Sequence, residues 1–300
     1  PARGSRSLVR ASEETIAERV PPRMTVRRGA ALETSHVLLL VDDPMHSIVE
    51  PLFHRHDELD RLYDFPLMMG GGHLTGYAVT APADIAAVYD ALDRLRARLD
   101  PDNPLLFAVG DGNHSLAAAK ACWEEIKPGL TPEQTVTHPA RFAMVELENI
   151  HDDALRMEPI HRVLLGCDGD DLLNDIAAFA AGKGASLAGG PQAQEITVVY
   201  EGKEVVLSVE GSPYKLAVGT LQAFLDQWLV SHPGARLDYV HGEDTVRSLV
   251  AGEGAVGFLL PPPDRDRLFP TILSEGALPR KTFSLGSANE KRYYLECRRL

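Results

Sequence analysis

The feature that most constrains the fold of this chain is a change of pattern within residues 105–127. Residues 105–109 are apolar and β-prone, residues 110–115 read Gly-Asp-Gly-Asn-His-Ser, and a helical pattern follows at once. In that helical pattern, Leu116, Ala119, Trp123 and Ile126 recur on one face. The segment therefore predicts a buried strand, a tight glycine turn and an amphipathic helix.

The chemistry of this turn has two interpretations. Glycines between a strand and a helix N-terminus let backbone N–H groups approach an anion, and Asp111 and His114 add groups that move protons or hold a metal. Gly110-x-Gly112-x-x-Ser115 comes close to a dinucleotide fingerprint, but Ser115 replaces the third glycine and no acidic ribose partner follows about 20 residues on. The alternative is a structural turn in which Asn113 or Asp111 caps the helix.

Composition bounds the class of protein. The chain has 300 residues, 44% of them apolar and 24% charged, which is typical of a globular protein with one large domain or two ordinary domains. Its 30 basic and 43 acidic residues give a net charge of −13, which argues against nucleic acid or an anionic membrane as partner. The three cysteines form no zinc spacing, and neither a signal peptide nor a membrane span is evident. These features predict a cytoplasmic protein with reduced thiols.

Periodicity predicts a mixed α/β fold in two parts that meet near residue 166. We expect residues 1–166 to form a ligand-binding domain and residues 167–300 a C-terminal α/β domain with a β-meander. In the first part the expected helices cover residues 8–19, 48–63 and 82–99, and the further strands cover 36–41, 74–79 and 141–147. In the second part a helix at 170–181 precedes a meander of strands at 196–200, 205–209 and 214–218, followed by elements at 219–231, 236–240, 243–251, 255–260, 264–275 and 292–296.

Three other polar groups are candidates for chemistry. Asp42-Asp43 follows an apolar strand and could bind Mg²⁺, although aspartates before a proline more often form turns. If strand 141–147 lies beside strand 105–109, His151 and the His161-Arg162 pair would fall near the glycine turn. The run from Arg280 to Ser284 combines cations and hydroxyls, which suits either a phosphate site or a solvated basic tail.

Longer stretches of the chain resemble one known family. They are GDGNHSLAAAK, HPARFAMVELENIHDDAL, EPIHRV, YVHGED and LPRKTFSLGSANEKRYYLE. Together they resemble the bacterial and archaeal family called domain of unknown function 1015, from residue 5 to the end. The family's D-G-H-H-R turn is matched at Asp111, Gly112 and His114, whereas Asn113 and Ser115 stand in place of its first His and its Arg.

Three further motifs of the family are found in this chain. They are H-E-x-T with a later Arg, P-x-H-R, and P-x-K-[ST], which match at Glu13, Thr15, Arg23, Pro159, His161, Arg162, Pro279, Lys281 and Thr282. Ser12 stands in place of the His in the first motif. Members of the family usually carry a further N-terminal segment, so the resemblance implies that this segment is missing here.

The family's turn is similar to the phosphate-binding turn of the ParB-like and sulfiredoxin-like superfamily, which includes nucleotide-dependent free-serine kinases and CTP-binding partition proteins. The resemblance therefore implies a nucleotide-phosphate site at residues 110–115. Arg162, Arg280 or Lys281 would replace the arginine that the turn lacks.

The leading hypothesis is a protein that binds ATP, ADP or CTP, with Mg²⁺, and transfers phosphate to a small polar metabolite. Backbone N–H groups from Gly112 to Ser115 would hold phosphate, and Glu13 or Asp111 would act as general base or Mg²⁺ ligand. The negative charge on the phosphate group during its transfer would be stabilised by His114, Arg162 and Lys281. The site would be completed by Gly110, Asn113, His161, Arg280 and Thr282.

Two alternatives remain open. Because Ser115 replaces the family's arginine, the chain could be a non-catalytic sensor that binds a ligand or a partner. A metal-dependent hydrolase would instead use Asp42, Asp111, His114 and His151. Whether the protein forms a homo-oligomer is not decided by the sequence.

Overall fold

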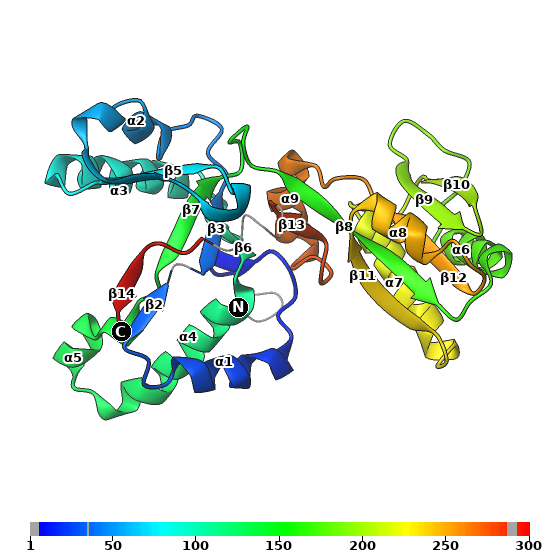
Figure 1. Cartoon of the computed structure of the whole chain (residues 1–300), viewed down its shortest axis with the longest axis horizontal. Coiled ribbons are helices and arrows are strands. Elements are labelled where there is room, and N and C mark those ends of the chain that lie inside the picture. The colour runs from blue at the N-terminus through cyan, green and yellow to red at the C-terminus, as the bar shows by residue number, and fades with distance from the viewer. Residues whose placement is uncertain (1–5, 35, 287–292) are drawn as a thin grey trace. The chain divides into compact units, whose positions relative to one another are not determined.

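The computed structural model describes residues 6–34, 36–286 and 293–300, and it confirms a mixed α/β fold (Figure 1). The chain divides into two compact units, which we call unit 1 (Pro1–Arg156 with Leu285–Leu300) and unit 2 (Met157–Ser284). The expected boundary at residue 166 thus differs from this division by the length of one strand. The reason is that β8 (Met157–Leu165) is hydrogen-bonded into the sheet of unit 2. Residues 285–300, which we expected in the C-terminal domain, belong to unit 1.

Unit 1 is built on a four-stranded sheet in the order β1-β6-β3-β7. The strands are β1 (Val9–Ala11), β6 (Phe107–Asp111), β3 (Val37–Val41) and β7 (Val145–Asn149). β6 is parallel to β1 and antiparallel to β3, whereas β7 is parallel to β3. Apolar side chains of one face pack against α3 (Pro82–Arg96), with Val41 and Ala91 both fully buried.

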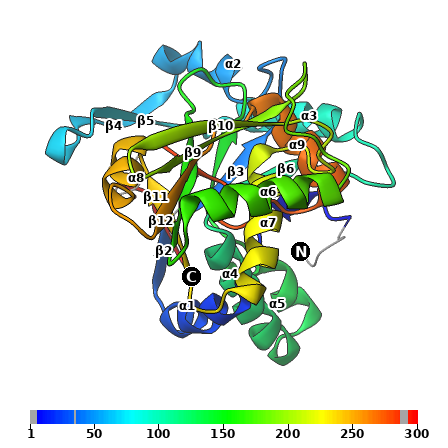
Figure 2. The ribbon, with the colours of Figure 1, turned by 90° about the vertical axis from the view of Figure 1, so that its right-hand side faces the viewer.

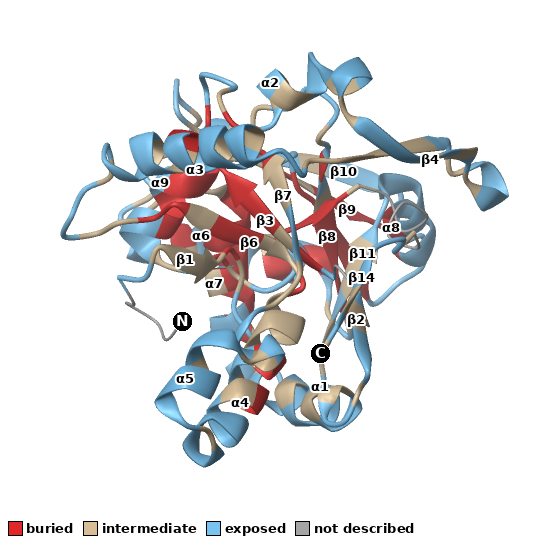
Figure 3. Cartoon of the chain, turned by 90° about the vertical axis from the view of Figure 1, so that its left-hand side faces the viewer, coloured by how far each residue is buried: buried red, intermediate tan, exposed pale blue. Residues whose placement is uncertain are grey.

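The other described elements of unit 1 surround this sheet, and many of them are exposed (Figure 3). They are η1 (Ala17–Arg19), α1 (Val20–Arg27), β2 (Leu32–Thr34), α2 (Glu50–Phe53), η2 (His56–Glu58), β4 (Asp60–Pro66), η3 (Met68–Gly70), β5 (His73–Ala78), α4 (Asn113–Ile126), η4 (Lys127–Gly129), α5 (Pro132–Thr137), η5 (Pro139–Arg141) and β14 (Cys297–Arg299). β4 and β5 form a hairpin, and β2 pairs with β14 near the C-terminus. α1 packs against α4, which follows the glycine turn.

Unit 2 contains a sheet in the order β10-β9-β12-β8-β11, and β13 (Phe283–Leu285) also pairs with β8. Its other elements are α6 (Gly169–Gly182), β9 (Gln194–Tyr200), β10 (Lys203–Val209), α7 (Ala217–Ser231), β11 (Arg236–His241), α8 (Glu243–Leu249), β12 (Ala255–Leu259) and α9 (Arg265–Glu275). α6 and α7 cover one face of the sheet, where Leu172, Leu225 and Phe258 are buried together (Figure 2). Val246 of α8 packs on the opposite face.

Several predicted elements differ from the structure. The helix expected at 8–19 is replaced by β1 and η1, because Pro21 and Pro22 lie in the first turn of α1 and so begin a helix there. The helix expected at 48–63 is reduced to α2, after which the chain enters β4. The third strand of the expected meander is absent among the described residues, since α7 already begins at Ala217. The final strand is β14, beyond the expected 292–296, of which residue 292 lies outside the described residues.

No helix in the described part of the chain is long and apolar enough to cross a membrane.

Candidate functional site

The glycine turn joins β6 directly to α4. Gly112 is the N-cap residue of α4 and has φ of 80°, a left-handed conformation that favours glycine. A Cβ at Gly112 would also collide with the backbone of His36 and Val37 at the start of β3. Since glycine has no side chain with which to cap the helix, the first N–H groups of this 14-residue helix receive no cap from the N-cap residue. The N-terminus is the end of a helix at which an anion is favoured.

The segment that follows β1 is tied to the turn by side-chain hydrogen bonds. The buried Ser12 hydroxyl donates to the Val109 carbonyl at 2.7 Å, and the Asn113 amide donates to the Glu13 carbonyl at 3.2 Å. The Ile16 N–H donates to Nε2 of His114 at 3.1 Å, which places the proton of a neutral ring on Nδ1. These bonds bring Glu13, a residue distant in sequence, to the turn.

Two polar atoms at the turn are notable. The side chain of Asp111 accepts a hydrogen bond from the Gly112 N–H at 2.7 Å, so it lies directly at the helix entrance. The side-chain oxygen of Asn113 is buried and has no hydrogen-bond partner among the described residues. A buried acceptor without a donor is costly, and a ligand hydroxyl or amine would satisfy it.

A row of carboxylates lies on the face of the unit 1 sheet that is opposite to α3. Leu38 pairs with Asp111 on one side and with Glu146 on the other, so the three side chains point to the same face. The two outer strands are about 10 Å apart at this level, twice the spacing between neighbouring strands. Glu148, two residues along β7, shares the face of Glu146.

Burial and mutual repulsion alter the ionisation of these groups. Burial, reinforced by the charges of Glu146 and Asp152, raises the pKa of Glu148 to about 7. Burial and the charge of Glu296 also raise the pKa of Glu146. One carboxyl oxygen of Glu148 is buried without a hydrogen-bond partner among the described residues. A carboxyl group with a pKa near 7 can exchange protons at neutral pH, as general acid–base catalysis requires.

Two tyrosines border this carboxylate face. The Tyr294 hydroxyl is 2.6 Å from Nδ1 of His36, and burial with the charges of Asp111 and Glu146 raises its pKa. The Tyr63 hydroxyl donates to Glu296, and this hydrogen bond and burial raise the pKa of Tyr63 to about 12. The charges of Asp111 and Glu146 both act on Tyr294, so its hydroxyl lies within electrostatic range of the glycine turn and of β7.

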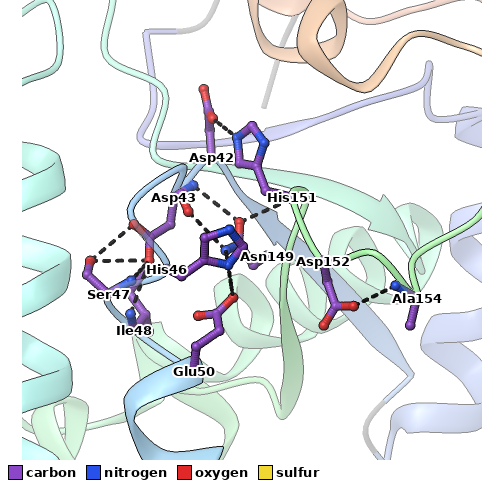
Figure 4. Close-up of polar contacts among 10 residues, drawn as sticks. All are labelled: Asp42, Asp43, His46, Ser47, Ile48, Glu50, Asn149, His151, Asp152 and Ala154. Atoms are coloured by element: carbon purple, nitrogen blue, oxygen red, sulfur yellow. Dashed lines mark hydrogen bonds and ion pairs between the residues drawn. The ribbon is translucent and has the colours of Figure 1, made fainter.

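A separate polar cluster lies at the other end of the same sheet, where β3 and β7 end (Figure 4). There the His151 ring is 2.7 Å from Asp42, while the buried Asp43 accepts hydrogen bonds from the Ser47 and Ile48 backbone N–H groups. Asp43 thus forms a turn, which was the interpretation favoured for Asp42-Asp43. Asn149, which is 4% exposed, joins the ends of β3 and β7.

This topology corrects the expectation for His151. β7 pairs with β3 and not with β6, and β6 runs antiparallel to both. The C-terminal end of β7, which His151 follows, is therefore at the opposite end of the sheet from Asp111 at the C-terminal end of β6. The four residues expected for a metal-dependent hydrolase are therefore split between the two ends of the sheet, Asp42 and His151 at one and Asp111 and His114 at the other. Among the residues that the structure describes, no three His, Cys, Asp or Glu side chains could hold a metal ion together.

The other predicted site residues gather in unit 2. His161 and Arg162 are neighbours on β8 and point to opposite faces of the sheet. Nδ1 of the buried His161 accepts the Leu260 N–H at 3.1 Å, and burial lowers its pKa. Arg162 is fully buried and donates to the carbonyls of Lys281 and Arg280 at 2.8 and 3.2 Å. The structure thus brings Arg162, Arg280, Lys281 and Thr282 together, in a unit separate from the glycine turn.

Sequence reasoning missed Glu146, Glu148 and Tyr294. The alternation of Glu146 and Glu148 with apolar residues in a predicted strand was a signal that both carboxylates share one face. The position of Tyr294 carried no such signal, because its contact with His36 joins residues 258 positions apart.

These features define unit 1 as an α/β sheet unit with an uncapped helix terminus beside a face of perturbed carboxyl groups. The chain belongs to the family described as "Protein of unknown function (DUF1015)", whose sequence model matches residues 3–228. The family expected from the sequence is thereby confirmed. No curated protein matches the chain.

Solved structures resemble this chain only distantly. A mutant free serine kinase in complex with ADP has a TM-score of 0.47 and 12% identity, over 93% of this chain and 84% of that chain. A conserved hypothetical protein from Pyrococcus furiosus has a TM-score of 0.46 and 10% identity, over 98% and 91%. C-terminally truncated SbnI from Staphylococcus aureus has a TM-score of 0.46 and 9% identity, over 94% and 80%. Similarity at this level says nothing about what this chain binds.

Proposed function

We propose that unit 1 binds a nucleotide, or another phosphorylated small molecule, at the turn formed by residues 110–115. The observation that carries the proposal is the left-handed, uncapped N-terminus of α4 at Gly112. Backbone N–H groups of residues 113–115 point out of the helix end, where phosphate oxygens can accept hydrogen bonds. The buried side-chain oxygen of Asn113 would accept a hydrogen bond from a ligand hydroxyl.

The carboxylates around the turn bear on the form of the ligand. Asp111 and Glu13 lie at the turn, and Glu146 shares the sheet face of Asp111, so a bare polyphosphate would meet like charges. A Mg²⁺ complex would remove this repulsion, since Mg²⁺ is usually held by one or two carboxylates together with substrate phosphates. Asp111 and Glu13 fit that donor set, whereas a site made only of protein ligands does not occur among the described residues.

The same groups support phosphate transfer to a small polar metabolite. Asp111, Glu13 or Glu148 would accept the proton of the attacking hydroxyl, and Glu148 is suited to this because its pKa lies near neutrality. The second candidate is a sensor that binds the nucleotide without turnover, and it is favoured by Ser115, which offers no cation where the wider family has arginine.

Calorimetric titration of the full chain with ATP, ADP and CTP, with and without Mg²⁺, tests the proposal. We expect binding that Mg²⁺ strengthens, and a loss of at least tenfold in affinity for Gly112→Ala, whose Cβ would displace the turn. The matched control is Gly129→Ala, just beyond the same helix, where a Cβ meets nothing within 4 Å. The proposal is wrong if no nucleotide binds, or if Gly112→Ala binds as well as the control.

Turnover separates the two candidates. Incubation with γ-labelled ATP and a panel of small hydroxyl-bearing metabolites should yield a labelled product if the protein is a phosphotransferase. Binding without labelled product across the panel would favour the sensor.

A further inference from the structure

The C-terminal residues of unit 1 hold an aromatic pair beside the glycine turn. The Tyr294 hydroxyl is 2.6 Å from Nδ1 of His36, and the two rings meet edge to face with their centres 5.2 Å apart. The backbone of His36 in turn lies against Gly112, since a Cβ at Gly112 would collide with the His36 carbonyl oxygen. Tyr294 is therefore connected through a single residue to the N-cap of α4.

This aromatic pair lies on the carboxylate face of the unit 1 sheet. His36 comes two residues before Leu38 at the start of β3, and side chains two residues apart in an extended chain point to the same face. Leu38 is in register with Asp111 on one side and with Glu146 on the other. The aromatic pair, the helix terminus and the two carboxylates therefore share one surface.

The segment that carries Tyr294 is anchored on both sides. Before it, the Tyr293 hydroxyl donates to the Met68 carbonyl, and the Tyr293 ring packs so closely on Gly71 that a Cβ there would collide with it. After it, β14 is hydrogen-bonded to β2. Tyr294 itself is nevertheless 40% exposed. An exposed ring whose hydroxyl and backbone are already fixed loses little conformational freedom when a planar ligand stacks on it.

Glu146 supplies a hydrogen-bond acceptor on the same surface. Its side chain is exposed, and its charge acts on the Tyr294 hydroxyl. A carboxylate accepts hydrogen bonds but cannot donate them, so it pairs with an amino group of a ligand and repels a keto oxygen. The ring and the acceptor together suit a planar base that carries an amino group.

We propose that Tyr294 is the base-stacking residue of the nucleotide site, and that Glu146 accepts a hydrogen bond from an exocyclic amino group of the base. The inference rests on the proposed function, which assigns the phosphates to the helix terminus, and it narrows the ligand to a nucleotide whose base carries such a group. Aromatic rings stack on any base because every base has a π-face, so the selectivity comes from the carboxylate. Adenine and cytosine offer an amino donor where hypoxanthine and uracil have a keto oxygen.

Calorimetric titration of the full chain with ATP and with inorganic tripolyphosphate, both with Mg²⁺, tests the stacking role. Tyr294→Ala should weaken ATP binding by about fivefold or more and tripolyphosphate binding by less than about twofold, because only ATP has a base. The matched control is Tyr89→Ala, an exposed tyrosine of α3, which packs on the other face of the sheet and should change neither affinity. Unchanged ATP affinity in Tyr294→Ala, or equal losses for the two ligands, would overturn the proposal.

Tyr294→Phe separates contact with the ligand from a structural role. This variant keeps the ring and removes the hydroxyl that is bonded to His36, so its ATP affinity should stay within about twofold of wild type. If Tyr294→Phe loses as much affinity as Tyr294→Ala, the hydroxyl acts by holding His36 against the turn and the stacking role is wrong.

Inosine triphosphate, whose base has a keto oxygen in place of the amino group of adenine, tests the role of Glu146. Wild type should prefer ATP over inosine triphosphate by about fivefold or more. Glu146→Gln should remove most of this preference, since an amide can also donate to a keto oxygen, whereas the control Glu195→Gln on β9 should keep it. A wild-type chain without the preference, or a preference that survives Glu146→Gln, would show that the assignment of Glu146 is wrong.

Adenosine, which has no phosphate, distinguishes this inference from the proposed function. Adenosine binding that Tyr294→Ala abolishes, with no binding of tripolyphosphate, would support the base site and contradict phosphate binding at the turn. Tripolyphosphate binding as tight as that of ATP, with both unchanged in Tyr294→Ala, would contradict the base site and leave phosphate binding at the turn standing.

Discussion

Replacing Glu148 by glutamine should make unit 1 more stable at alkaline pH and have a much smaller effect near pH 5. Burial beside Glu146 raises the pKa of Glu148 from the ordinary 4.5 to about 7. The folded state therefore keeps a proton that the unfolded chain has already lost. Stability contributed by this group is complete below about pH 4.5 and declines as the pH rises to about 7. Glutamine cannot ionise, so it removes the decline.

The size of the effect follows from the pKa difference. A pKa difference of one corresponds to about 1.4 kcal/mol, so the difference of 2.5 between 7 and 4.5 gives an upper limit of about 3.5 kcal/mol. Partial contact of this side chain with solvent lowers the expectation to about 2 kcal/mol. Glu148→Gln should thus raise the free energy of unfolding by about 2 kcal/mol at pH 8 and by only about 0.5 kcal/mol at pH 5, which lies just above the ordinary pKa of 4.5.

Urea unfolding at pH 5, 6, 7 and 8 measures this difference. The chain has two tryptophans, and Trp123 in α4 reports on unit 1 when Trp228 of unit 2 is replaced by phenylalanine. The matched control is Glu195→Gln, an exposed glutamate on β9, which should change the stability by less than about 0.5 kcal/mol at each pH. An effect of Glu148→Gln that is independent of pH, or a loss of stability at pH 8, would refute the reasoning.

Three other predictions concern the polar cluster of unit 1 and the core of unit 2. Asn149→Ala should lower the free energy of unfolding by about 2–3 kcal/mol, because it leaves buried groups of Asp43 without partners; a loss below about 0.5 kcal/mol in urea unfolding would contradict this. His46→Ala should cost stability at pH 6 and less at pH 9, since the hydrogen bond that the His46 ring donates to Glu50 raises the pKa of His46, and this contribution is lost as the pH rises through the folded value. Thermal unfolding at the two pH values checks it, and an equal cost at both would count against it. Leu225 is fully buried in α7, so Leu225→Ala should lower the free energy of unfolding of unit 2 by about 2–5 kcal/mol. The fluorescence of Trp228 measures this change, and a change below about 1 kcal/mol would show that the core relaxes around the substitution.

Local patterns were sufficient to predict the elements whose signals lie in consecutive residues. The helix expected at 82–99 is α3 (Pro82–Arg96), and the strand and helix around the glycine turn are β6 and α4. At one proline pair the signal had two local meanings, and there the interpretation was wrong. Pro21 and Pro22 read equally as the end of one helix and the start of the next, and the structure uses them to start α1.

Strand order could not be predicted from such patterns, and it decides which residues share a site. Had β7 paired with β6, His151 could have lain near the glycine turn; because β3 separates them, Asp42 and His151 meet at the far edge instead. The same order places Glu146 in register with Leu38 and Asp111. The motif residues of the turn were thus predictable one by one, but the carboxylates that surround them depend on pairing between strands distant in sequence.

The carboxylate face bears on which ligand the proposed turn site would select. An arginine at position 115 would attract any phosphate. With Ser115, only the N–H groups and the dipole of the helix terminus favour an anion, and Asp111 and Glu13 lie beside it. In such surroundings a free anion is repelled, and an anion that carries its own Mg²⁺ is attracted by the same groups. The dependence of nucleotide affinity on Mg²⁺ should therefore be steep, and Ser115→Arg should make it shallower by adding a cation at the helix end. An unchanged Mg²⁺ dependence in Ser115→Arg would show that the carboxylates do not govern the choice of ligand.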